Sequence, residues 1–413
     1  MTVTGLIKPP PGTTAISAEK LDRRTDEEIA AWLQERHEVV SEKNVWAFWN
    51  SGFKTMPAWS QRNVINWVRR LGPDWTVHVL DAVPDSETNV RHFLDDMETV
   101  LPKAFNEGTM DGPTVGQHQA DLVRLPLIYQ HGGIWMDVGM ILFRHVDDIC
   151  WNAITDPTSP YEVGGFTMQL RPGVESMMNS FIAARKGNLF IKRWHDIFAT
   201  VWGQQTNAYA PSFHKHPLLR PIPLPKLTAE QLNAPEATVS MAFLGDYLTQ
   251  VQCFERLRKV IEPAEFGFNG PEYYAAHVLL LPSMSEMYYL QGVSSWQGPK
   301  EFALLSAKST SDGDDISLRE EASRVVDHML ANTATMKLSH APPGEVPFLA
   351  DIWSRPEHRD ADIAKDTFAA YMRYGSVHFD QDRGLEPMEV GIDTKGALRT
   401  GLLESVMNGD CTN

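Results

Sequence analysis

The stretch HQADLVRLPLIYQHGGIWMDVGMILF (residues 118–143) joins a helix-like apolar run to a short apolar strand through a pair of glycines. Asp121 and Arg124 are three residues apart, so on a helix they share one face. Nearly all of their neighbours are apolar, and a buried charged pair is costly unless it has a function. A surface ion pair of little energetic value is the alternative interpretation. Pro126 should kink or interrupt the helix just after Arg124.

The strand that follows ends in a single carboxylate. Side chains alternate along a strand, so Trp135, Asp137 and Gly139 point to one side and their neighbours to the other. A strand-terminal Asp often only caps the next turn. Because Asp137 is separated from the Asp/Arg helix by one two-glycine turn and a short strand, it is also a candidate ligand for a divalent cation or for sugar hydroxyls.

The preceding sequence predicts a βαβ unit. Residues 45–49 (VWAFW) form an apolar run typical of a buried strand, residues 57–71 have helical periodicity, and residues 75–81 alternate as a strand. A strand, a helix and a strand within about 40 residues imply a parallel sheet. Ligands in open α/β sheets bind at the carboxyl ends of strands, so Trp49, Asp81 and Asp137 should open onto one crevice.

The rest of the chain predicts further helices and irregular segments. We expect helices over residues 18–42, 90–101, 179–203 (with a break at Gly187-Asn188) and 243–261. We expect disorder in the first 16 residues, an irregular connection over the proline-rich residues 216–227, and a mobile loop over residues 306–318.

Composition excludes several classes of protein. The chain has 413 residues and a formal net charge of -16, which argues against a nucleic-acid partner because a phosphate backbone requires a basic surface. Its three cysteines are widely spaced, which fits a reducing compartment better than a disulfide framework. We find neither a signal-peptide pattern nor an apolar run of about 18 residues, so we expect a cytoplasmic protein without a membrane span.

Residues 120–139 (ADLVRLPLIYQHGGIWMDVG) resemble the core of retaining GT-A glycosyltransferases of the capsular polysaccharide synthesis and family 32 mannosyltransferase kind. They are also similar to the catalytic domains of the large glucosylating bacterial toxins. The shared motif is a helical Asp and Arg, a Gly-Gly-aromatic turn and a strand ending in Asp-x-Asp. The likeness spans residues 44–150 and extends more weakly to NSFIAARKG (residues 179–187) and MKLSH (residues 336–340).

The resemblance implies a GT-A type α/β fold, a Rossmann-like, mostly parallel sheet flanked by helices, with added helical segments. On this basis we divide the chain into three parts. Residues 1–43 are an N-terminal extension with a helix, residues 44–345 are the catalytic domain, and residues 346–413 are a C-terminal extension packed on that domain.

The resemblance also implies roles for single residues. Trp49 matches the tryptophan that stacks on the nucleotide base, although Trp46, on the opposite face of the same strand, is an alternative. Asp121 and Arg124 match the pair that contacts the nucleotide sugar and the donor hexose. Asp137 matches the first Asp of the Asp-x-Asp motif, which contacts ribose and sugar and binds metal partly through water.

Gly139 stands where the family's direct metal ligand usually stands, whereas Trp135 and Asp137 match the motif and are expected to bind the donor. We therefore expect only partial dependence on Mn²⁺ or Mg²⁺. The motif MKLSH offers Lys337, Ser339 and His340 as donor-binding residues: two potential cations, which can neutralise the negative charge of the diphosphate, and a hydroxyl. An ordinary solvated lysine is the alternative interpretation of Lys337.

Three further sites have weaker support. Ser295 and Trp296 form a rival closing element, because the toxins and the family 32 enzymes end on a Ser/Trp pair. Asn179 and Asp246 are candidates for acceptor or lid contacts.

We predict a retaining glycosyltransferase that moves a hexose from a nucleotide diphosphate sugar to an acceptor hydroxyl. We favour UDP-hexose as donor and leave GDP-mannose open, and we expect the acceptor to be a small metabolite or a glycan. Two competing interpretations remain: a hydrolase of nucleotide sugars, and a nucleotide-sugar-binding protein with a degenerate Asp-x-Asp motif.

Overall fold

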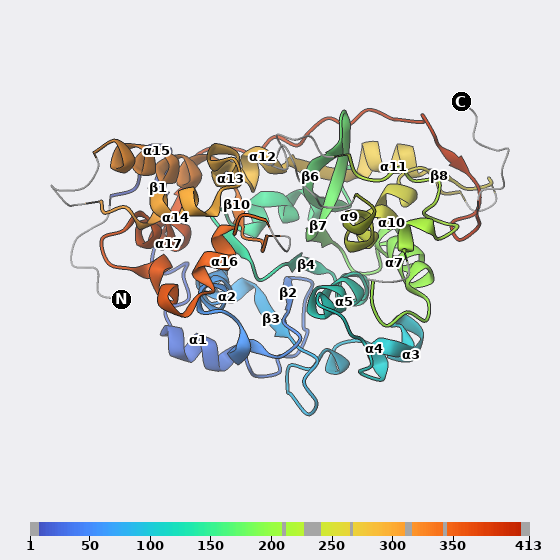
Figure 1. Ribbon diagram of the computed structural model, residues 1–413, viewed down its shortest axis with the longest axis horizontal. Coiled ribbons are helices and arrows are strands. Elements are labelled where there is room, and N and C mark those ends of the chain that lie inside the picture. The colour runs from blue at the N-terminus through green and yellow to red at the C-terminus, as the bar shows by residue number, and fades with distance from the viewer. Residues whose placement is uncertain are drawn as a thin grey trace.

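The computed structural model describes residues 8–208, 212–226, 241–264, 267–309, 316–341 and 345–405. Its centre is a six-stranded sheet with the strand order β3-β2-β4-β7-β6-β9 (Figure 1). The bounds are β2 Asn44–Phe48, β3 Thr76–Leu80, β4 Gly133–Met136, β6 Val163–Arg171, β7 Val174–Ala184 and β9 Val278–Pro282. Five of these strands run in one direction, and β7 runs antiparallel to its neighbours β4 and β6. The predicted α/β architecture with a mostly parallel sheet is confirmed.

Helices cover both faces of the sheet. Helix α2 (Ala58–Leu71) connects β2 to β3, as predicted, and its apolar side packs with Val45, Ala47 and Ile134. The opposite face, which includes Trp46 and Trp135, packs with α5 (Val115–His131) and α7 (Leu189–Trp202). Side chains of β2 and β4 therefore alternate between two hydrophobic clusters, with the phase that the sequence predicts.

Helix α5 runs through Pro126 without an interruption, so the predicted break after Arg124 is wrong. Proline removes one backbone hydrogen bond, but residues 121–128 are all buried against the sheet and α7, and this burial offsets the loss. The helix ends at Gly132, whose φ is 72°, and Gly133 has a φ of 102°. A Cβ at Gly133 would overlap the Asn44 carbonyl oxygen, so the turn requires both glycines.

Several predicted helices differ in the structure. Residues 179–184 belong to β7, because a strand buried on both faces shows the same continuous apolar run as a buried helix. The first helix is confined to α1 (Asp26–Trp32). The single helix predicted over 90–101 is broken into η3 Val90–His92 and α3 Met97–Val100, and a further short helix, α4 Lys103–Asn106, follows. The helix predicted over 243–261 is broken into α9 Met241–Tyr247, α10 Thr249–Leu257 and β8 Val260–Ile261.

The predictions for irregular segments have mixed outcomes. Residues 13–15 are ordered as strand β1, which pairs with β11 (Phe379–Gln381), so disorder over the first 16 residues is wrong there. Residues 1–7 lie outside the described part. Residues 217–226 contain neither helix nor strand, as predicted. Residues 310–315 of the predicted loop 306–318 lie outside the described residues. Its two ends are helical, since α14 ends at Ser306 and α15 begins at Ile316, so the predicted loop is wrong at residues 306 and 316–318.

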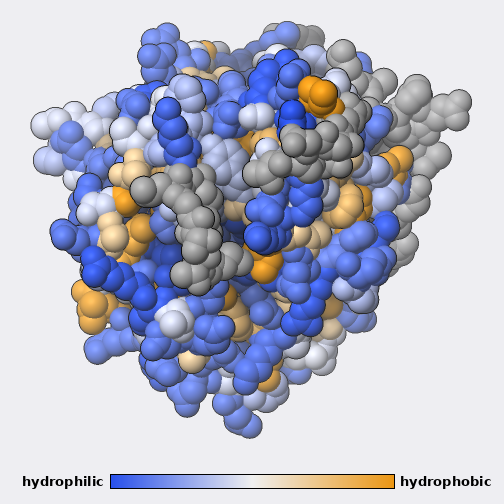
Figure 2. All heavy atoms as spheres, turned by 90° about the vertical axis from the view of Figure 1, so that its left-hand side faces the viewer, coloured by the Kyte–Doolittle hydropathy of each residue, from blue (hydrophilic) through white to orange (hydrophobic). Residues whose placement is uncertain are grey.

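The C-terminal part of the chain contributes further helices and short strands, which are α11 Gly270–His277, α12 Ser283–Glu286, α13 Tyr289–Ser294, α14 Gly298–Ser306, α15 Ile316–Asn332, β10 Thr335–Lys337, α16 Leu349–Trp353, α17 Phe368–His378 and β12 Leu398–Arg399. Helices α14 to α17 lie on the left of Figure 1, whereas α11 and the end of the chain lie on the right. The surface turned to the viewer in Figure 2 is mostly hydrophilic, with hydrophobic side chains in small separate groups. None of the helices in the described segments combines the length and hydropathy needed to cross a membrane.

The segment that follows β4 pairs with a short strand from the C-terminal part of the chain. Strand β5 (Met140–Leu142) pairs antiparallel with β10, so that Lys337 lies opposite Met140. Immediately beyond the pair, the Leu338 amide donates to the Gly139 carbonyl at 2.8 Å. A Cβ at Gly139 would overlap the Leu338 carbonyl oxygen, although φ at Gly139 is not in the left-handed region. Gly139 is therefore required by the close approach of two backbones.

Replacing Gly139 by Ala should destabilise the protein. Inserting a methyl group into a closed backbone contact costs about 1–3 kcal/mol, because β10 must move away. Urea unfolding of Gly139→Ala measures this loss. The control is Gly384→Ala, at a position where a Cβ meets nothing within 4 Å. Equal stability of the two variants would show that the contact between residues 139 and 338 is not tight.

Candidate active site

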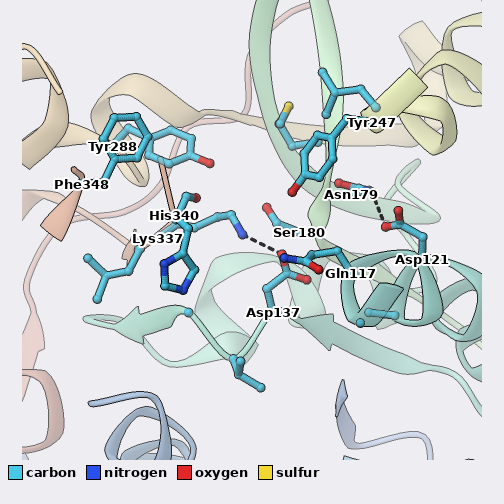
Figure 3. Close-up of a pocket in the computed structure, with 18 of the residues that line it drawn as sticks. Gln117, Asp121, Asp137, Asn179, Ser180, Tyr247, Tyr288, Lys337, His340 and Phe348 are labelled. Carbon is cyan, nitrogen blue, oxygen red and sulfur yellow. Dashed lines mark hydrogen bonds and ion pairs between the residues drawn. The ribbon is translucent and has the colours of Figure 1, made fainter. Parts of the chain in front are cut away.

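A cavity of about 1010 Å³ opens at the carboxyl ends of β2 and β4. Phe48 and Trp49 come from the end of β2, and Asp137 to Gly139 follow β4. The middle of β7, the first half of α5 and residues 337–340 complete the polar part of the wall (Figure 3). The volume lies at the upper end of the range of small-molecule sites. The crevice predicted at the strand ends is therefore present.

Asp121 and Arg124 meet on one side of α5, inside this cavity. The Arg124 guanidinium lies 2.8 Å from Asp121 Oδ1 and donates to the Asn179 carbonyl oxygen at 2.6 Å. The Asn179 side chain donates to Asp121 Oδ1 at 3.1 Å, and the Gln250 side chain donates to the Asp121 carbonyl oxygen at 2.6 Å. Arg124 also lies over the Trp135 ring, 4.9 Å from its centroid. The pair is thus buried and fixed by four surrounding groups.

Asp137, Arg124 and Lys337 form a charged cluster that we call the polar floor of the cavity, with Asp137 at its centre. Lys337 Nζ is 2.6 Å from Asp137 Oδ2, while Trp135 Nε1 donates to Oδ1 at 2.9 Å and an Arg124 nitrogen lies 3.6 Å from Oδ1. Burial alone would raise the pKa of Asp137, but the charges of Lys337 and Arg124 and these hydrogen bonds hold the pKa below its ordinary value. Asp137 is therefore ionised at neutral pH and compensated by two fixed cations.

Of the two tryptophans on β2 and its end, only Trp49 lines the cavity. Its ring is partly buried, and its Nε1 donates to Thr55 Oγ1 at 2.9 Å. Trp46 has no exposed surface, stacks on His78 and donates to the Gly132 carbonyl oxygen. Asp81 does not line the cavity: both of its carboxylate oxygens accept hydrogen bonds from residues 83–88. Trp49 can thus meet a ligand, whereas Trp46 and Asp81 are structural.

Both predicted closing elements line the same cavity. Ser295 and Trp296 follow α13, with φ values of 56° and 59° in the left-handed region. The Trp296 ring packs between Tyr288 and Phe348. Gln291 joins the two elements, because its carbonyl oxygen accepts from the Trp296 amide and its side chain donates to the Lys337 carbonyl oxygen at 3.0 Å. The elements are parts of one wall and not alternatives.

The remaining predicted site residues lie farther from the polar floor or outside the cavity. Ser339 and His340 line the cavity, and His340 Nδ1 is 2.6 Å from Asp351 Oδ1. Asp246 does not line the cavity. It lies 2.8 Å from His214 Nδ1 and also accepts from the His214 amide, which is a local structural contact.

The structure adds polar residues that the sequence did not single out. His118, buried beside Tyr247, lies 3.4 Å from Asp121 Oδ2. Ser180 is 2% exposed and lines the cavity, and its Oγ has no hydrogen-bond partner among the described residues. Figure 3 shows the hydroxyl of Tyr247 directed toward Ser180. His118 is one helical turn before Asp121, which was an available signal, whereas Tyr247 and Gln250 come from distant helices.

Many of the other residues that line the cavity are apolar, and we refer to them as the apolar wall. They are methionine, leucine, valine and aromatic side chains from β6, β7, α9 and the residue after it, α12 and the segment before α16, namely Met168, Met178, Leu244, Leu248, Met284, Val346 and Phe348. Such a wall offers contact area and few hydrogen bonds. The cavity therefore combines a charged floor with a wall suited to an apolar molecule.

The residues around Asp137 do not fit a protein-bound divalent cation. Within the described ranges no group of three or more His, Cys, Asp or Glu side chains could hold a metal ion. Mg²⁺ is usually held by one or two carboxylates together with substrate phosphates. Here Asp137 is already paired with Lys337, and Gly139 supplies no side-chain ligand. A dication would have to displace a fixed ammonium group.

Comparison with known proteins identifies the family of this chain. The model of the family described as "Capsular polysaccharide synthesis protein" matches residues 12–220. O-glycosyltransferase braB from Annulohypoxylon truncatum is 55% identical over 402 residues, which cover 96% of this chain and 94% of that protein. Glycosyltransferase afumC from Aspergillus fumigatus is 43% identical over 391 residues, covering 94% of this chain and 98% of that protein.

O-glycosyltransferase PaGT from Phomopsis amygdali is 40% identical over 391 residues, covering 93% of this chain and 94% of that protein. The solved structure titled "PaToxG Glycosyltransferase" covers 56% of this chain and 92% of its own, with 14% identity and a TM-score of 0.28, too low to establish a common fold. The family match and the full-length relatives together show that this chain is a glycosyltransferase and belongs to the capsular polysaccharide synthesis protein family.

Proposed function

We propose that the enzyme transfers a hexose from a nucleotide diphosphate sugar to a hydroxyl group of a small, largely apolar molecule, with retention of the anomeric configuration. The observation that carries this proposal is the charged cluster of Asp137, Lys337 and Arg124 on the floor of the cavity. A site for a diphosphate sugar needs positive charge for the phosphates and fixed oxygen acceptors for the sugar hydroxyls, and this cluster supplies both.

The donor occupies the part of the cavity between β2 and α5. Trp49 stacks on the base, Asp121 and Arg124 bind the sugar, and Lys337 lies beside the diphosphate. UDP-hexose is the favoured donor, by the resemblance to the glucosylating toxins, and GDP-mannose is the second candidate. The burial of Arg124, which is 3% exposed, strengthens its interaction with an anionic ligand because water does not screen it.

Transfer with retention places the acceptor on the face from which the diphosphate departs. The bond between the hexose C1 and the phosphate oxygen breaks, and its electron pair stays on the diphosphate. The acceptor oxygen forms the new bond to C1, and its proton passes to the departing phosphate oxygen. Because the phosphate oxygen takes the proton, this route does not require a carboxylate as general base. Asp121 and Asp137 are both held in ion pairs.

The apolar wall supports an apolar acceptor. A glycan acceptor would need many hydrogen-bonding partners, whereas methionine and leucine side chains bind a ligand through the apolar surface that is buried in the contact. Two relatives are named O-glycosyltransferases, which supports oxygen as the accepting atom. A cytoplasmic location remains a prediction of the sequence.

A panel of nucleotide sugars, tested by thermal shift and then with apolar alcohols, tests the proposal. We expect one UDP-sugar or GDP-sugar to stabilise the protein and to give an O-glycoside whose anomeric coupling constant in the proton spectrum matches that of the donor. Free sugar as the sole product with every acceptor would indicate a hydrolase, and saturable binding without turnover would indicate a binding protein. The relatives named glycosyltransferases favour neither of these alternatives.

Asp137→Asn should lower turnover by about 10²-fold, the scale of losing one preorganised electrostatic contact. The amide keeps the shape of the side chain but loses the charge that holds Lys337 and Arg124 in place. Turnover at saturating donor is the measurement, with the melting temperature as the check on folding. A variant that retains more than half of the activity would remove Asp137 from the site.

Trp49→Ala should weaken nucleotide binding by about 1–3 kcal/mol, the usual contribution of stacking between an aromatic ring and a base. Trp46→Ala is the matched variant and should instead destabilise the fold by about 3–5 kcal/mol, because Trp46 is fully buried. Calorimetric titration with UDP and GDP separates the two effects. Normal nucleotide affinity in folded Trp49→Ala would contradict the stacking role.

Met284→Asp should raise the KM for an apolar acceptor by roughly tenfold while donor affinity stays unchanged, because a charge replaces apolar contact area on the wall. Met284 is 47% exposed, so the fold should tolerate the change. Ile392→Asp, at an exposed apolar position outside the cavity lining, is the control and should match the parent enzyme. A loss of donor affinity in Met284→Asp would place the donor on the apolar wall.

A further inference from the structure

The second carboxylate of the Asp-x-Asp motif is replaced by a backbone contact. The Leu338 carbonyl oxygen occupies the space that any side chain at position 139 would enter. The Leu338 amide donates to the Gly139 carbonyl at 2.8 Å, and this hydrogen bond holds the two backbones together at the contact. A carboxylate at position 139 is therefore excluded by the position of the residues that follow β10.

The residue next to this contact supplies a positive charge to Asp137, the first carboxylate of the motif. Lys337 directly precedes Leu338, and its Nζ lies 2.6 Å from Asp137 Oδ2. The backbone of Lys337 is fixed at two points, since its amide donates to the Met287 carbonyl and its carbonyl accepts from Gln291. The Lys337 side chain is 15% exposed, so the ammonium group is inside the cavity and not in bulk solvent. The backbone contact that excludes a side chain at position 139 thus lies next to the residue whose ammonium group pairs with Asp137.

We propose that Lys337, held on Asp137 by the contact between Gly139 and Leu338, takes the place of the divalent cation and makes sugar transfer independent of metal. The inference rests on the proposed function and adds to it the identity of the cation that meets the diphosphate. Lys337 offsets the negative charge that develops on the phosphate oxygen as the C1–O bond breaks, while the acceptor proton passes to the phosphate.

Ser180 supports a ligand at this place independently. Ser180 lines the cavity, and its Oγ is buried and makes no hydrogen bond with the described residues. The Asp137 amide donates to the Ser180 carbonyl at 3.0 Å, which places Ser180 directly beside the ion pair, as Figure 3 shows. A buried hydroxyl without a partner costs free energy, so its natural partner is an oxygen of a bound ligand.

His340 does not share this role in the structure. Its Nδ1 is 2.6 Å from Asp351 Oδ1, and its side chain is 48% exposed. In Figure 3 the Lys337 side chain, and not the His340 ring, extends to Asp137. The charge that faces the diphosphate is therefore assigned to Lys337 together with Arg124.

The full-length enzyme tests the inference without any substitution. After exhaustive chelation, we expect turnover and the affinities for UDP and GDP to stay within about twofold of those measured with added Mn²⁺, because the cation is part of the chain. Loss of turnover in the chelator that Mn²⁺ restores would overturn the inference. A tenfold or larger loss of nucleotide affinity in the chelator would also overturn it.

Variants of Lys337 test the assignment of the charge. Lys337→Met keeps the length of the side chain and should lower turnover by about 10²-fold or more in chelator, whereas Lys337→Arg should retain a larger part of it. Lys43→Met is the matched control, since Lys43 pairs with Asp147 at 3.2 Å outside the cavity lining, and its turnover should equal that of the parent. A folded Lys337→Met enzyme with normal turnover in chelator would overturn the assignment.

Failure of the inference and failure of the proposed function give different results. If neither UDP nor GDP binds and no nucleotide sugar is turned over under any condition, the proposed function is wrong. If nucleotide binds and sugar is transferred but only with Mn²⁺ present, the proposed function stands and the role of Lys337 as the replacement cation is wrong.

Discussion

The ion pair between Lys337 and Asp137 joins two parts of the chain that are 200 residues apart in the sequence. It forms where the end of β4 meets the end of β10, and it requires the glycine at 139 because the two backbones touch there. Removing either charge would leave the other partly buried without its nearest counter-charge. The arrangement of the floor, and of the C-terminal third that supplies β10, depends on this contact.

Arg124 connects the ion pair to the rest of the site. It lies within 4 Å of both Asp121 and Asp137, covers the Trp135 ring and donates to the backbone of β7. Three neighbouring elements, α5, β4 and β7, are thus fixed relative to one another by one guanidinium group. Such a site is preorganised, so binding energy is not spent on arranging charges when a diphosphate enters.

Local patterns in the sequence predicted the part of the fold that is local. The βαβ unit, the two-glycine turn and the side of β4 that bears Trp135 and Asp137 follow from periodicity, and the structure has them. Residues 179–184 of β7 were predicted as helix because a strand buried on both faces has no alternation. Tyr247 and Ser180 line the cavity, and Gln250 binds the Asp121 carbonyl oxygen, from elements whose positions depend on tertiary packing, so spacing along the chain gives no signal for them. The exclusion of a side chain at 139 likewise depends on Leu338, almost two hundred residues later.

The most direct test of the central claim is a structure of the enzyme crystallised with UDP or GDP and soaked in Mn²⁺, with anomalous data collected at the manganese edge. The account predicts that Lys337 Nζ lies within hydrogen-bonding distance of a phosphate oxygen, with Asp137 still paired to it and without an anomalous peak between Asp137 and the diphosphate. A manganese peak that bridges Asp137 and the phosphates, with Lys337 displaced from the carboxylate, would contradict it.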